Sequence, residues 1–318
     1  FRPGRGPHDA LDALAVTFRK KVNWVLDADI RGFFDTLDHE WLVKFIEHRI
    51  GDKRLLRLIR KWLNAGTVED GRWSPSTTGT PQGATISPLL ANIYLHYVLD
   101  LWVHQWRRCT TRGAVCIVRY ADDFVVGFQY QTDAVRFTKN LRQRLQKFSL
   151  ELHPEKTRMI EFGVFAADNR FARGLGKPET FDFLGFTHIC ARTRGGRYFQ
   201  VRRLTSRKRM RSKLAELGIQ LHRRRHHSIP EQGRWLSSVL RGHFEYFGVP
   251  GNVHAIGQFR KEIDKHWLRA LRRRSQRHRL TWDRMRRIAE RWLPRARIQH
   301  PHPEKRFHAN TRGRSPVR

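Results

Sequence analysis

The pattern of hydrophobic and polar positions predicts helices mixed with strands over the first 200 residues. Residues 22–30 alternate with a period of two, and residues 116–128 place Val, Ile, Phe and Tyr on both sides of a short polar turn, as in a tight hairpin. Such a mixture is typical of an α+β protein. Amphipathic helices are expected at 37–50, 52–64, 89–106 and 132–148, a hairpin at 67–76, a strand after the turn at Pro154, a strand at 181–189 and its partner at 197–201.

From about Leu204 the pattern changes to helices rich in arginine. Apolar residues recur there at helical spacing in three stripes, which predicts amphipathic helices. From Arg295 onward Pro, His and Arg dominate, and we expect a tail that is extended or becomes ordered on RNA. The three apolar stripes are Leu214, Leu217 and Leu221; Trp235, Val239 and Leu240; and Ile256, Phe259, Ile263 and Trp267.

Charge makes nucleic acid the first partner to consider. The formal net charge is +34, with 31 basic and 21 acidic residues in 1–200 (+10) against 32 and 8 in 201–318 (+24). So positive a surface attracts polyanions. A solvated helix face explains any single basic run, but RNA binding explains the whole C-terminal block better. The candidate RNA-binding residues are Arg223, Arg224, Arg225, Arg241, Arg272, Arg273 and Arg274.

The remaining composition excludes several classes. No run of about 18 apolar residues exists, so we expect no segment that spans a membrane. An anionic membrane surface comes second to nucleic acid as a partner for so basic a chain, and we predict no membrane partner. The three cysteines stand far apart and form neither a zinc motif nor a disulfide framework, which fits a reducing cytoplasm.

Acidic residues gather at the ends of predicted strands. Asp122 and Asp123 form a pair in the turn of the central hairpin, and Asp27 and Asp29 share one face of the strand at 22–30. Adjacent carboxylates repel each other, and oxygen ligands suit Mg²⁺, so Asp29 and the pair are candidates for a common metal site. The alternative for the pair is an ordinary solvated turn. Asp35 and Asp38 are better explained as turn or N-cap residues.

Two further polar residues occupy suggestive positions. Gln82 lies in a Gly/Pro/Thr loop that leads into a helix, where its amide could meet a base, sugar or phosphate. A plain loop-to-helix junction with Ser87 as N-cap and Pro88 at the first helical position is compatible with that role. Lys156 precedes a strand and could neutralise or protonate a leaving phosphate, although a lone lysine there is usually just solvated.

Five motifs then follow one another in a recognisable order. They are D-I-R-G-F-F-D at 29–35, T-P-Q-G-A-T-I-S-P-L-L-A-N at 80–92, R-Y-A-D-D-F at 119–124, H-P-E-K-T at 153–157 and F-L-G-F at 183–186. Together they resemble the reverse-transcriptase blocks of proteins encoded by bacterial group II introns. The segment L-R-G-H-F-E-Y-F-G-V-P-G-N at 240–252 resembles the maturase-specific region of that family, and R-G-R-S-P-V-R at 312–318 resembles its usual ending.

The resemblance implies an architecture and a set of site residues. The fold would be a right-hand polymerase, with partial fingers and a palm of antiparallel sheet in 1–202, an α-helical thumb or maturase (X) domain in 203–294, and a basic tail in 295–318. Asp29, Asp122 and Asp123 would be the catalytic carboxylates that bind two Mg²⁺ ions. Phe34 would be the aromatic gate that excludes a 2′-hydroxyl, and Gln82 and Lys156 would contact the nucleotide.

The resemblance also implies an activity and partners. The chain would be an RNA-directed DNA polymerase and maturase, with group II intron RNA, an RNA template/DNA primer duplex and dNTPs as partners, in a bacterial cytoplasmic nucleoprotein. The family's opening blocks would precede Phe1, and no endonuclease module follows Arg318, as in members without that domain. The alternative is a non-catalytic RNA-binding splicing factor. A retron or diversity-generating element fits less well, because neither would be expected to carry the maturase block.

Overall fold

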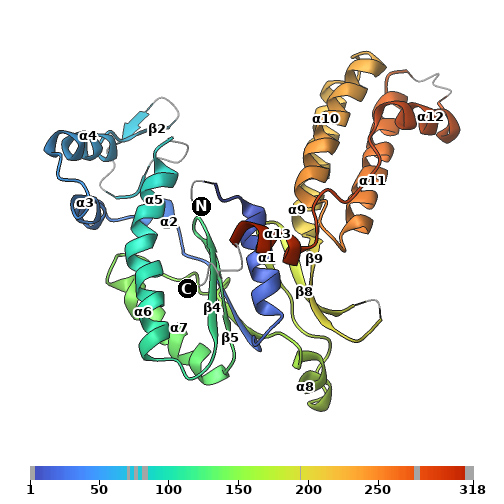
Figure 1. Ribbon diagram of the computed structural model, residues 1–318. Coiled ribbons are helices and arrows are strands. Elements are labelled where there is room, and N and C mark those ends of the chain that lie inside the picture. Colours follow the sequence, from blue (N-terminus) through green and yellow to red (C-terminus); the bar gives the residue numbers. More distant parts are fainter. Residues whose placement is uncertain are drawn as a thin grey trace.

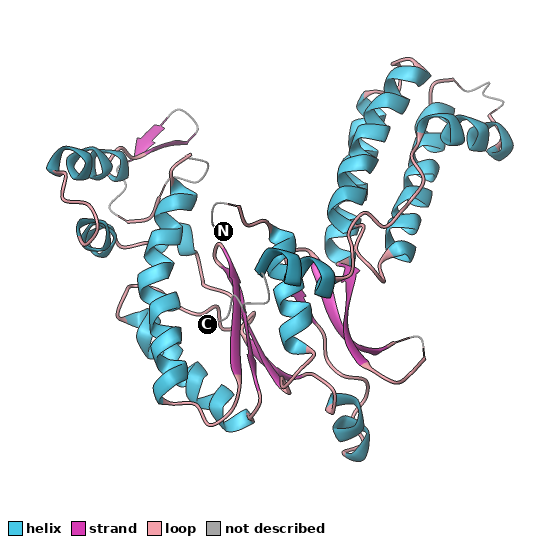
Figure 2. Cartoon of the chain, viewed as in Figure 1, coloured by secondary structure: helices cyan, strands magenta, loops and turns pink. Residues whose placement is uncertain are grey.

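The structure is a computed structural model that describes residues 4–69, 72–74, 78–80, 85–193, 195–275 and 280–311. A twisted antiparallel sheet carries helices on both faces, and a separate group of long helices follows it (Figures 1 and 2). The predicted α+β class, with an antiparallel sheet followed by a helical region, is confirmed. None of the helices in this part of the chain has the length and apolar composition that a bilayer crossing requires.

The elements follow the predicted order closely. The helices are α1 (Pro7–Phe18), α2 (Phe33–Thr36), α3 (His39–Glu47), α4 (Lys53–Leu63), α5 (Ser87–Leu95), the π-helix η1 (His96–Asp100), α6 (Leu101–Cys109), α7 (Gln131–Gln146), α8 (Ala166–Ala172), α9 (Arg207–Arg223), α10 (Ile229–Phe247), α11 (Val253–Arg272), α12 (Trp282–Trp292) and α13 (Pro303–Thr311). The strands are β1 (Trp24–Ala28), β2 (Thr67–Glu69), β3 (Arg72–Ser74), β4 (Val115–Tyr120), β5 (Asp123–Phe128), β6 (Arg158–Glu161), β7 (Phe181–Phe183), β8 (Phe186–Arg192) and β9 (Phe199–Thr205).

The central sheet has the order β4-β5-β1-β6, and every neighbouring pair is antiparallel. Because side chains alternate along a strand, β1 contributes to two cores. Val25 packs with Phe18 of α1 on one face, whereas Leu26 packs with Phe137 of α7 on the other. Helices therefore cover both faces of the sheet (Figure 1).

The helical region has a core of its own, built from the three predicted apolar stripes. Trp267 of α11 is its largest fully buried side chain, and its indole Nε1 donates a hydrogen bond to Gln232 Oε1 at 2.7 Å. The amide of Gln232 in turn donates to the backbone carbonyl of Arg224 at 2.6 Å. The tryptophan thus fixes both the packing of α11 against α10 and the turn between α9 and α10.

Three sequence predictions need correction. Ser87, expected as an N-cap, is the first residue of α5, and Ile86 is its N-cap. The single strand expected at 181–189 is two strands, because Leu184 and Gly185 have φ values of 49° and 80° and turn the chain back on itself. The tail is not simply extended: α13 packs against α1, where Arg306 pairs with the buried carboxylate of Asp12 and Glu304 pairs with Arg19 at 2.6 Å. Those partners lie almost 300 residues earlier, so local composition could not indicate them.

A buried histidine in the three-stranded sheet makes stability depend on pH. His188 of β8 is fully buried and stacks on Phe181 with ring centroids 4.8 Å apart. Burial, and then the positive charge of Arg203, lowers its pKa to about 3 from the ordinary 6.5. The unfolded chain therefore binds a proton that the folded chain does not bind between those two pH values, and stability falls as pH falls below about 6.5.

We expect His188→Phe to reduce this acid sensitivity. Between pH 7.5 and 5.5 the free energy of unfolding should fall by roughly 1.4 kcal/mol more in the wild type than in the variant. Urea titrations at the two pH values measure the difference. An identical pH dependence in both proteins would contradict the assignment to His188.

Candidate active site

The hairpin of β4 and β5 ends in a two-residue turn made of Ala121 and Asp122. Tyr120 pairs with Asp123 across the base of the turn. Ala121 has a φ of 56°, in the left-handed region that two-residue hairpin turns require at their first central position. The tight turn predicted for these residues is confirmed, and it presents two successive carboxylates at the end of the sheet.

Asp29 reaches the same end of the sheet from β1. The register between β1 and β5 ends with Ala28 opposite Phe124, so the next residues outward are Asp29 and Asp123. The backbone amide of His153 donates to the carbonyl of Asp29 at 2.8 Å, which brings the following loop alongside. From that loop, Lys156 places its Nζ 2.9 Å from Asp29 Oδ2.

The carboxylates at this edge influence one another electrostatically. Asp123 has an exposed side chain, yet the protein atoms around its carboxylate partly desolvate it, and this desolvation is the largest cause of its raised pKa. The negative charges of Asp122 and Asp29 raise that pKa further, and Arg209 at the start of α9 opposes them. On the other side of the cluster, the hydrogen bond and charge of Asp29 raise the pKa of Lys156. Three carboxylates and two cationic side chains therefore share one small region.

Asp27, two residues before Asp29, is engaged differently. Its Oδ2 lies 3.4 Å from Nε of Arg158 on β6. Burial raises the pKa of Asp27 to about 6, and the charge of Arg158 opposes that rise. This carboxylate therefore has a partner within the sheet. The choice of Asp29 over Asp27 as the metal-binding residue stays a prediction.

The donor set suits a divalent cation chemically. Among the described residues, no group of three or more His, Cys, Asp or Glu side chains is already arranged to hold a metal ion. However, Asp29, Asp122 and Asp123 offer only carboxylate oxygens, which Mg²⁺ prefers, and the repulsion that raises the pKa of Asp123 is the kind that a bound cation relieves. Lys156 neutralises part of that charge here.

The predicted sugar gate, Phe34, lies on the short helix α2. It is partly buried and makes an edge-on contact with the buried ring of Phe33, at a centroid distance of 5.3 Å. Asp38, just beyond the helix, accepts a hydrogen bond from the amide of Trp41 at 3.1 Å, so it is the N-cap of α3, as expected.

The start of the loop that carries Gln82 is held against this helix. The amide of Thr80 donates to the carbonyl of Phe34, and that of Gly79 donates to the carbonyl of Leu37, both at 2.7 Å. A Cβ on Gly79 would meet Phe34 O at 2.6 Å, and φ there is +80°, so only glycine allows this approach. Gln82 itself lies outside the described residues.

A basic groove lies between α9 and α11. Its volume is about 490 Å³, and Arg223, Arg269 and Arg273 line it together with His222 and His266. All three arginines are exposed, and none of them has an ion-pair partner among the described residues. Sequence reasoning missed Arg269 and His266. Their spacing to Arg273, at four and seven residues, was the available signal that one helix face carries them all.

Some arginines predicted to bind RNA already have partners within the protein. Arg272 donates from Nε and Nη2 to the carbonyl of Leu280 at 3.1 and 3.0 Å. Arg274 donates to the carbonyl of His227, and burial lowers the pKa of its guanidinium. Both side chains hold the ends of loops in place.

The other arginines of that set are exposed, except Arg225, which is half-buried. Arg224 lies over the ring of Trp235 at 5.0 Å, and Arg225 donates to the ring nitrogens of neighbouring histidines. Arg241 is exposed on α10. RNA binding by these residues, and by Arg223 and Arg273 in the groove, stays a prediction.

Comparison with known proteins agrees with the motifs. The family model of reverse transcriptases (RNA-dependent DNA polymerases) matches residues 1–188. Protein YkfC of Escherichia coli (strain K12) is 31% identical over 193 residues, which are 50% of this chain and 50% of YkfC. The group II intron-encoded protein LtrA of Lactococcus lactis subsp. cremoris is 44% identical over 105 residues, 33% of this chain and 17% of LtrA. A solved telomerase from Candida albicans aligns with 97% of this chain and 50% of its own, at 14% identity and a TM-score of 0.42.

The chain thus spans half or less of the length of the curated relatives named above. The matched region contains every motif that carried the resemblance except the maturase segment and the ending. The predicted family is confirmed: the chain belongs to the reverse transcriptases and, within them, is similar to the proteins encoded by group II introns.

Proposed function

We propose that this chain is the RNA-directed DNA polymerase of a group II intron and that it also binds the intron RNA as a maturase. One observation carries the proposal: Asp29, just after β1, lies at the same end of the sheet as Asp122 and Asp123 of the β4–β5 hairpin, and the charges of Asp29 and Asp122 raise the pKa of Asp123. In a reverse transcriptase, such a cluster is where nucleotidyl transfer would occur.

The reaction is attack by the 3′-hydroxyl of a primer on the α-phosphate of a deoxynucleoside triphosphate, with release of pyrophosphate. Two Mg²⁺ ions held by Asp29, Asp122 and Asp123 would supply the positive charge that the attacking and leaving oxygens need. The side chains contribute mainly by positioning the reacting groups. The hairpin fixes two of the carboxylates, and β1 fixes the third. Lys156 carries a proton on Nζ beside them, and the hydrogen bond and charge of Asp29 raise its pKa.

The template and primer would extend from this edge toward the helical region. Arg209, which acts on Asp123, begins α9, and the groove between α9 and α11 lies farther along the same helix. Arginines that lack carboxylate partners neutralise phosphates well, and they recognise RNA through its backbone and shape. The groove is therefore the proposed grip on the RNA–DNA duplex or the intron RNA.

We expect Phe34→Ala to weaken the discrimination between deoxynucleotides and ribonucleotides by roughly 10–100-fold, because the aromatic ring no longer fills the space beside the 2′-carbon. Single-nucleotide incorporation with dATP and ATP measures the ratio of kcat/KM values. Phe34→Tyr keeps the ring and is the matched control. Unchanged discrimination in Phe34→Ala would remove Phe34 from the sugar site.

A non-catalytic splicing factor is the second candidate, and the ion pair of Lys156 with Asp29 favours it, because an ammonium group there takes part of the charge that a metal would take. Primer extension on an RNA template with Mg²⁺ and dNTPs, by the wild type and by Asp122→Asn, separates the two functions. DNA synthesis by the wild type alone supports the polymerase. Splicing of the parent intron with no DNA synthesis by either protein supports the splicing factor.

A further inference from the structure

The turn that carries the carboxylate pair is held in an unfavourable backbone conformation. Ala121 has a φ of 56°, and a left-handed conformation costs about 1–2 kcal/mol for a residue with a Cβ. Such a conformation persists only where the surrounding structure enforces it. Because Asp122 and Asp123 directly follow Ala121, the constraint on the turn bears directly on where their carboxylates lie.

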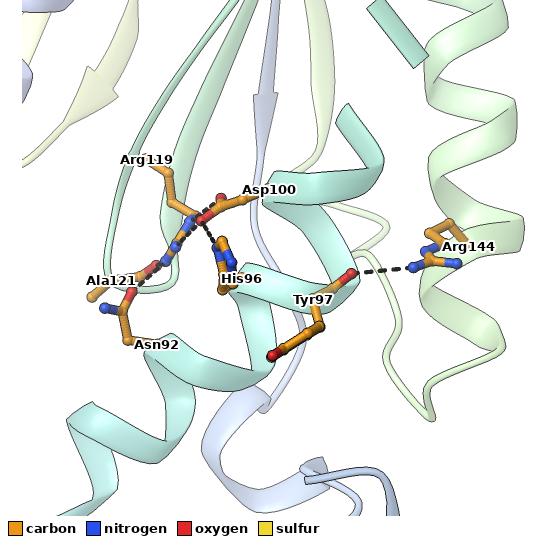
Figure 3. Close-up of polar contacts among 7 residues, drawn as sticks. All are labelled: Asn92, His96, Tyr97, Asp100, Arg119, Ala121 and Arg144. Atoms are coloured by element: carbon orange, nitrogen blue, oxygen red, sulfur yellow. Dashed lines mark hydrogen bonds and ion pairs between the residues drawn. The ribbon is translucent and has the colours of Figure 1, made fainter. Parts of the chain in front are cut away.

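One arginine adds to the constraint that the strand pairing places on the turn. Arg119, two residues before the turn, donates from Nη1 to the carbonyl of Ala121 at 2.7 Å and to Oδ1 of Asn92 at 3.0 Å (Figure 3). Its Nε and Nη2 donate to the two carboxylate oxygens of Asp100 at 2.7 and 2.5 Å. Only 9% of the Arg119 side chain is exposed. The guanidinium thus ties the tip of the hairpin to a rigid helix through a bidentate ion pair.

The helix is shaped to offer both partners. An α-helix turns about 100° per residue, so eight residues of regular helix would leave Asn92 and Asp100 about 80° apart. The π-helix η1 lies between them, and its wider turn takes up that difference. Figure 3 shows both side chains directed at Arg119 from one side of the helix. A π-helix that serves this contact is consistent with the frequent occurrence of such segments at functional sites.

A second arginine stabilises the π-helix from its other side. Arg144 of α7 donates from Nη2 to the carbonyl of Tyr97 at 3.2 Å (Figure 3). It also donates from Nε to the carbonyl of Val98 at 3.1 Å. These are carbonyls of the π-helix, whose hydrogen-bond pattern departs from that of its neighbours. Arg144 therefore supplies hydrogen-bond donors to carbonyls of the irregular segment. This holds the segment, and with it Asp100, in position for the ion pair with Arg119.

We propose that Arg119 and Asp100 are positioning residues for nucleotidyl transfer: their ion pair fixes the Ala121 carbonyl and so sets the positions of Asp122 and Asp123. The inference rests on the proposed polymerase function. A purely structural ion pair is the competing explanation, because buried ion pairs occur without catalytic purpose and contribute little net stability. The two explanations differ in the kcat expected for a variant that keeps the charge but loses the bidentate hydrogen bonds of Arg119.

Arg119→Lys and Asp100→Asn make that distinction. The first keeps the charge and the second keeps the shape, and both remove the paired hydrogen bonds. In primer extension we expect kcat to fall by roughly 10–100-fold in both variants, with the KM for dNTP changed less than about threefold, because small misplacements reduce turnover more than binding. The Tm of both variants should fall, because each leaves a buried group with fewer partners, so kcat is measured at a temperature well below Tm.

Arg203→Lys is the matched control, because Arg203 of β9 is also a buried arginine. Its Nη1 lies 2.8 Å from Oδ1 of Asp12, and this ion pair does not involve the turn. Arg203→Lys should lower Tm and leave kcat unchanged. Wild-type kcat in Arg119→Lys would overturn the proposal. So would a loss of kcat that merely tracks Tm in all three variants.

Hydrogen exchange separates this proposal from the function on which it rests. If the wild type makes no DNA, the polymerase assignment fails, but the effect of Arg119 on the turn can still be measured in the protein alone. We expect the backbone amides of residues 120–124 to exchange at least about tenfold faster in Arg119→Lys than in the wild type, with the amides of β1 unchanged. Equal exchange at the turn in the two proteins would show that Arg119 does not hold it.

Discussion

Asp122→Asn and Asp123→Asn are each expected to lower the rate of DNA synthesis on an RNA template by about a thousandfold, which corresponds to about 4 kcal/mol of transition-state stabilisation. Each change preserves the shape of the side chain and removes one negative charge from the cluster that would hold the metal ions. Asp29→Asn should have a similar effect, because Asp29 completes that cluster from β1. Primer extension under single-turnover conditions measures the rate.

We expect these changes not to lower the stability of the folded state. Because the charges of Asp122 and Asp29 raise the pKa of Asp123, the carboxylates repel one another, and removing one charge should leave Tm unchanged or slightly higher without metal. Asp27→Asn is the matched control, since Asp27 lies on the same strand but pairs with Arg158, and we expect it to slow synthesis by less than about tenfold. Full activity in Asp122→Asn, or an equal loss in Asp27→Asn, would contradict the assignment of the site.

Local pattern was enough to predict the parts of this site that lie within one hairpin or one strand. Alternation of apolar residues located β1, the Val, Ile, Phe and Tyr residues on both sides of a polar turn located β4 and β5, and that turn located Asp122 and Asp123. Strand pairing was not visible in the pattern, so the approach of Asp29 to Asp123 depended on the family resemblance and is now explained by the register. Periodicity also missed the π-helix, since a five-residue change in helical pitch leaves the run of apolar positions intact.

The interactions that hold the site together were beyond prediction for a different reason. Arg119 lies close to the carboxylate pair in the sequence, but its partners Asn92 and Asp100 are 27 and 19 residues away. Likewise, nothing in a basic run distinguishes Arg272, which holds the carbonyl of Leu280, from Arg273, which lines the groove. Charge composition indicated that the C-terminal helical region binds RNA. The role of each arginine, however, depends on the direction in which its face of the helix points.

Replacing Arg223, Arg269 and Arg273 together by glutamine is expected to weaken RNA binding about a hundredfold at 0.15 M salt. Each phosphate that an arginine neutralises contributes about 0.9 to the slope of log affinity against log salt, so the triple variant should show a slope smaller by about 2.7 and an affinity lower by roughly two decades at this concentration. Fluorescence anisotropy with a labelled RNA–DNA template–primer duplex, repeated over a series of salt concentrations, measures both quantities.

The matched control removes the same charge elsewhere in the helical region. Arg284, Arg286 and Arg287 are exposed on α12, and their triple glutamine variant has the same net charge as the groove variant. If the groove binds the duplex, the α12 variant should keep most of the affinity and nearly the full salt slope, because long-range attraction to so basic a protein changes little when three of many charges are removed. Equal decreases in affinity in the two variants would mean that the net charge, and not the groove between α9 and α11, attracts the RNA.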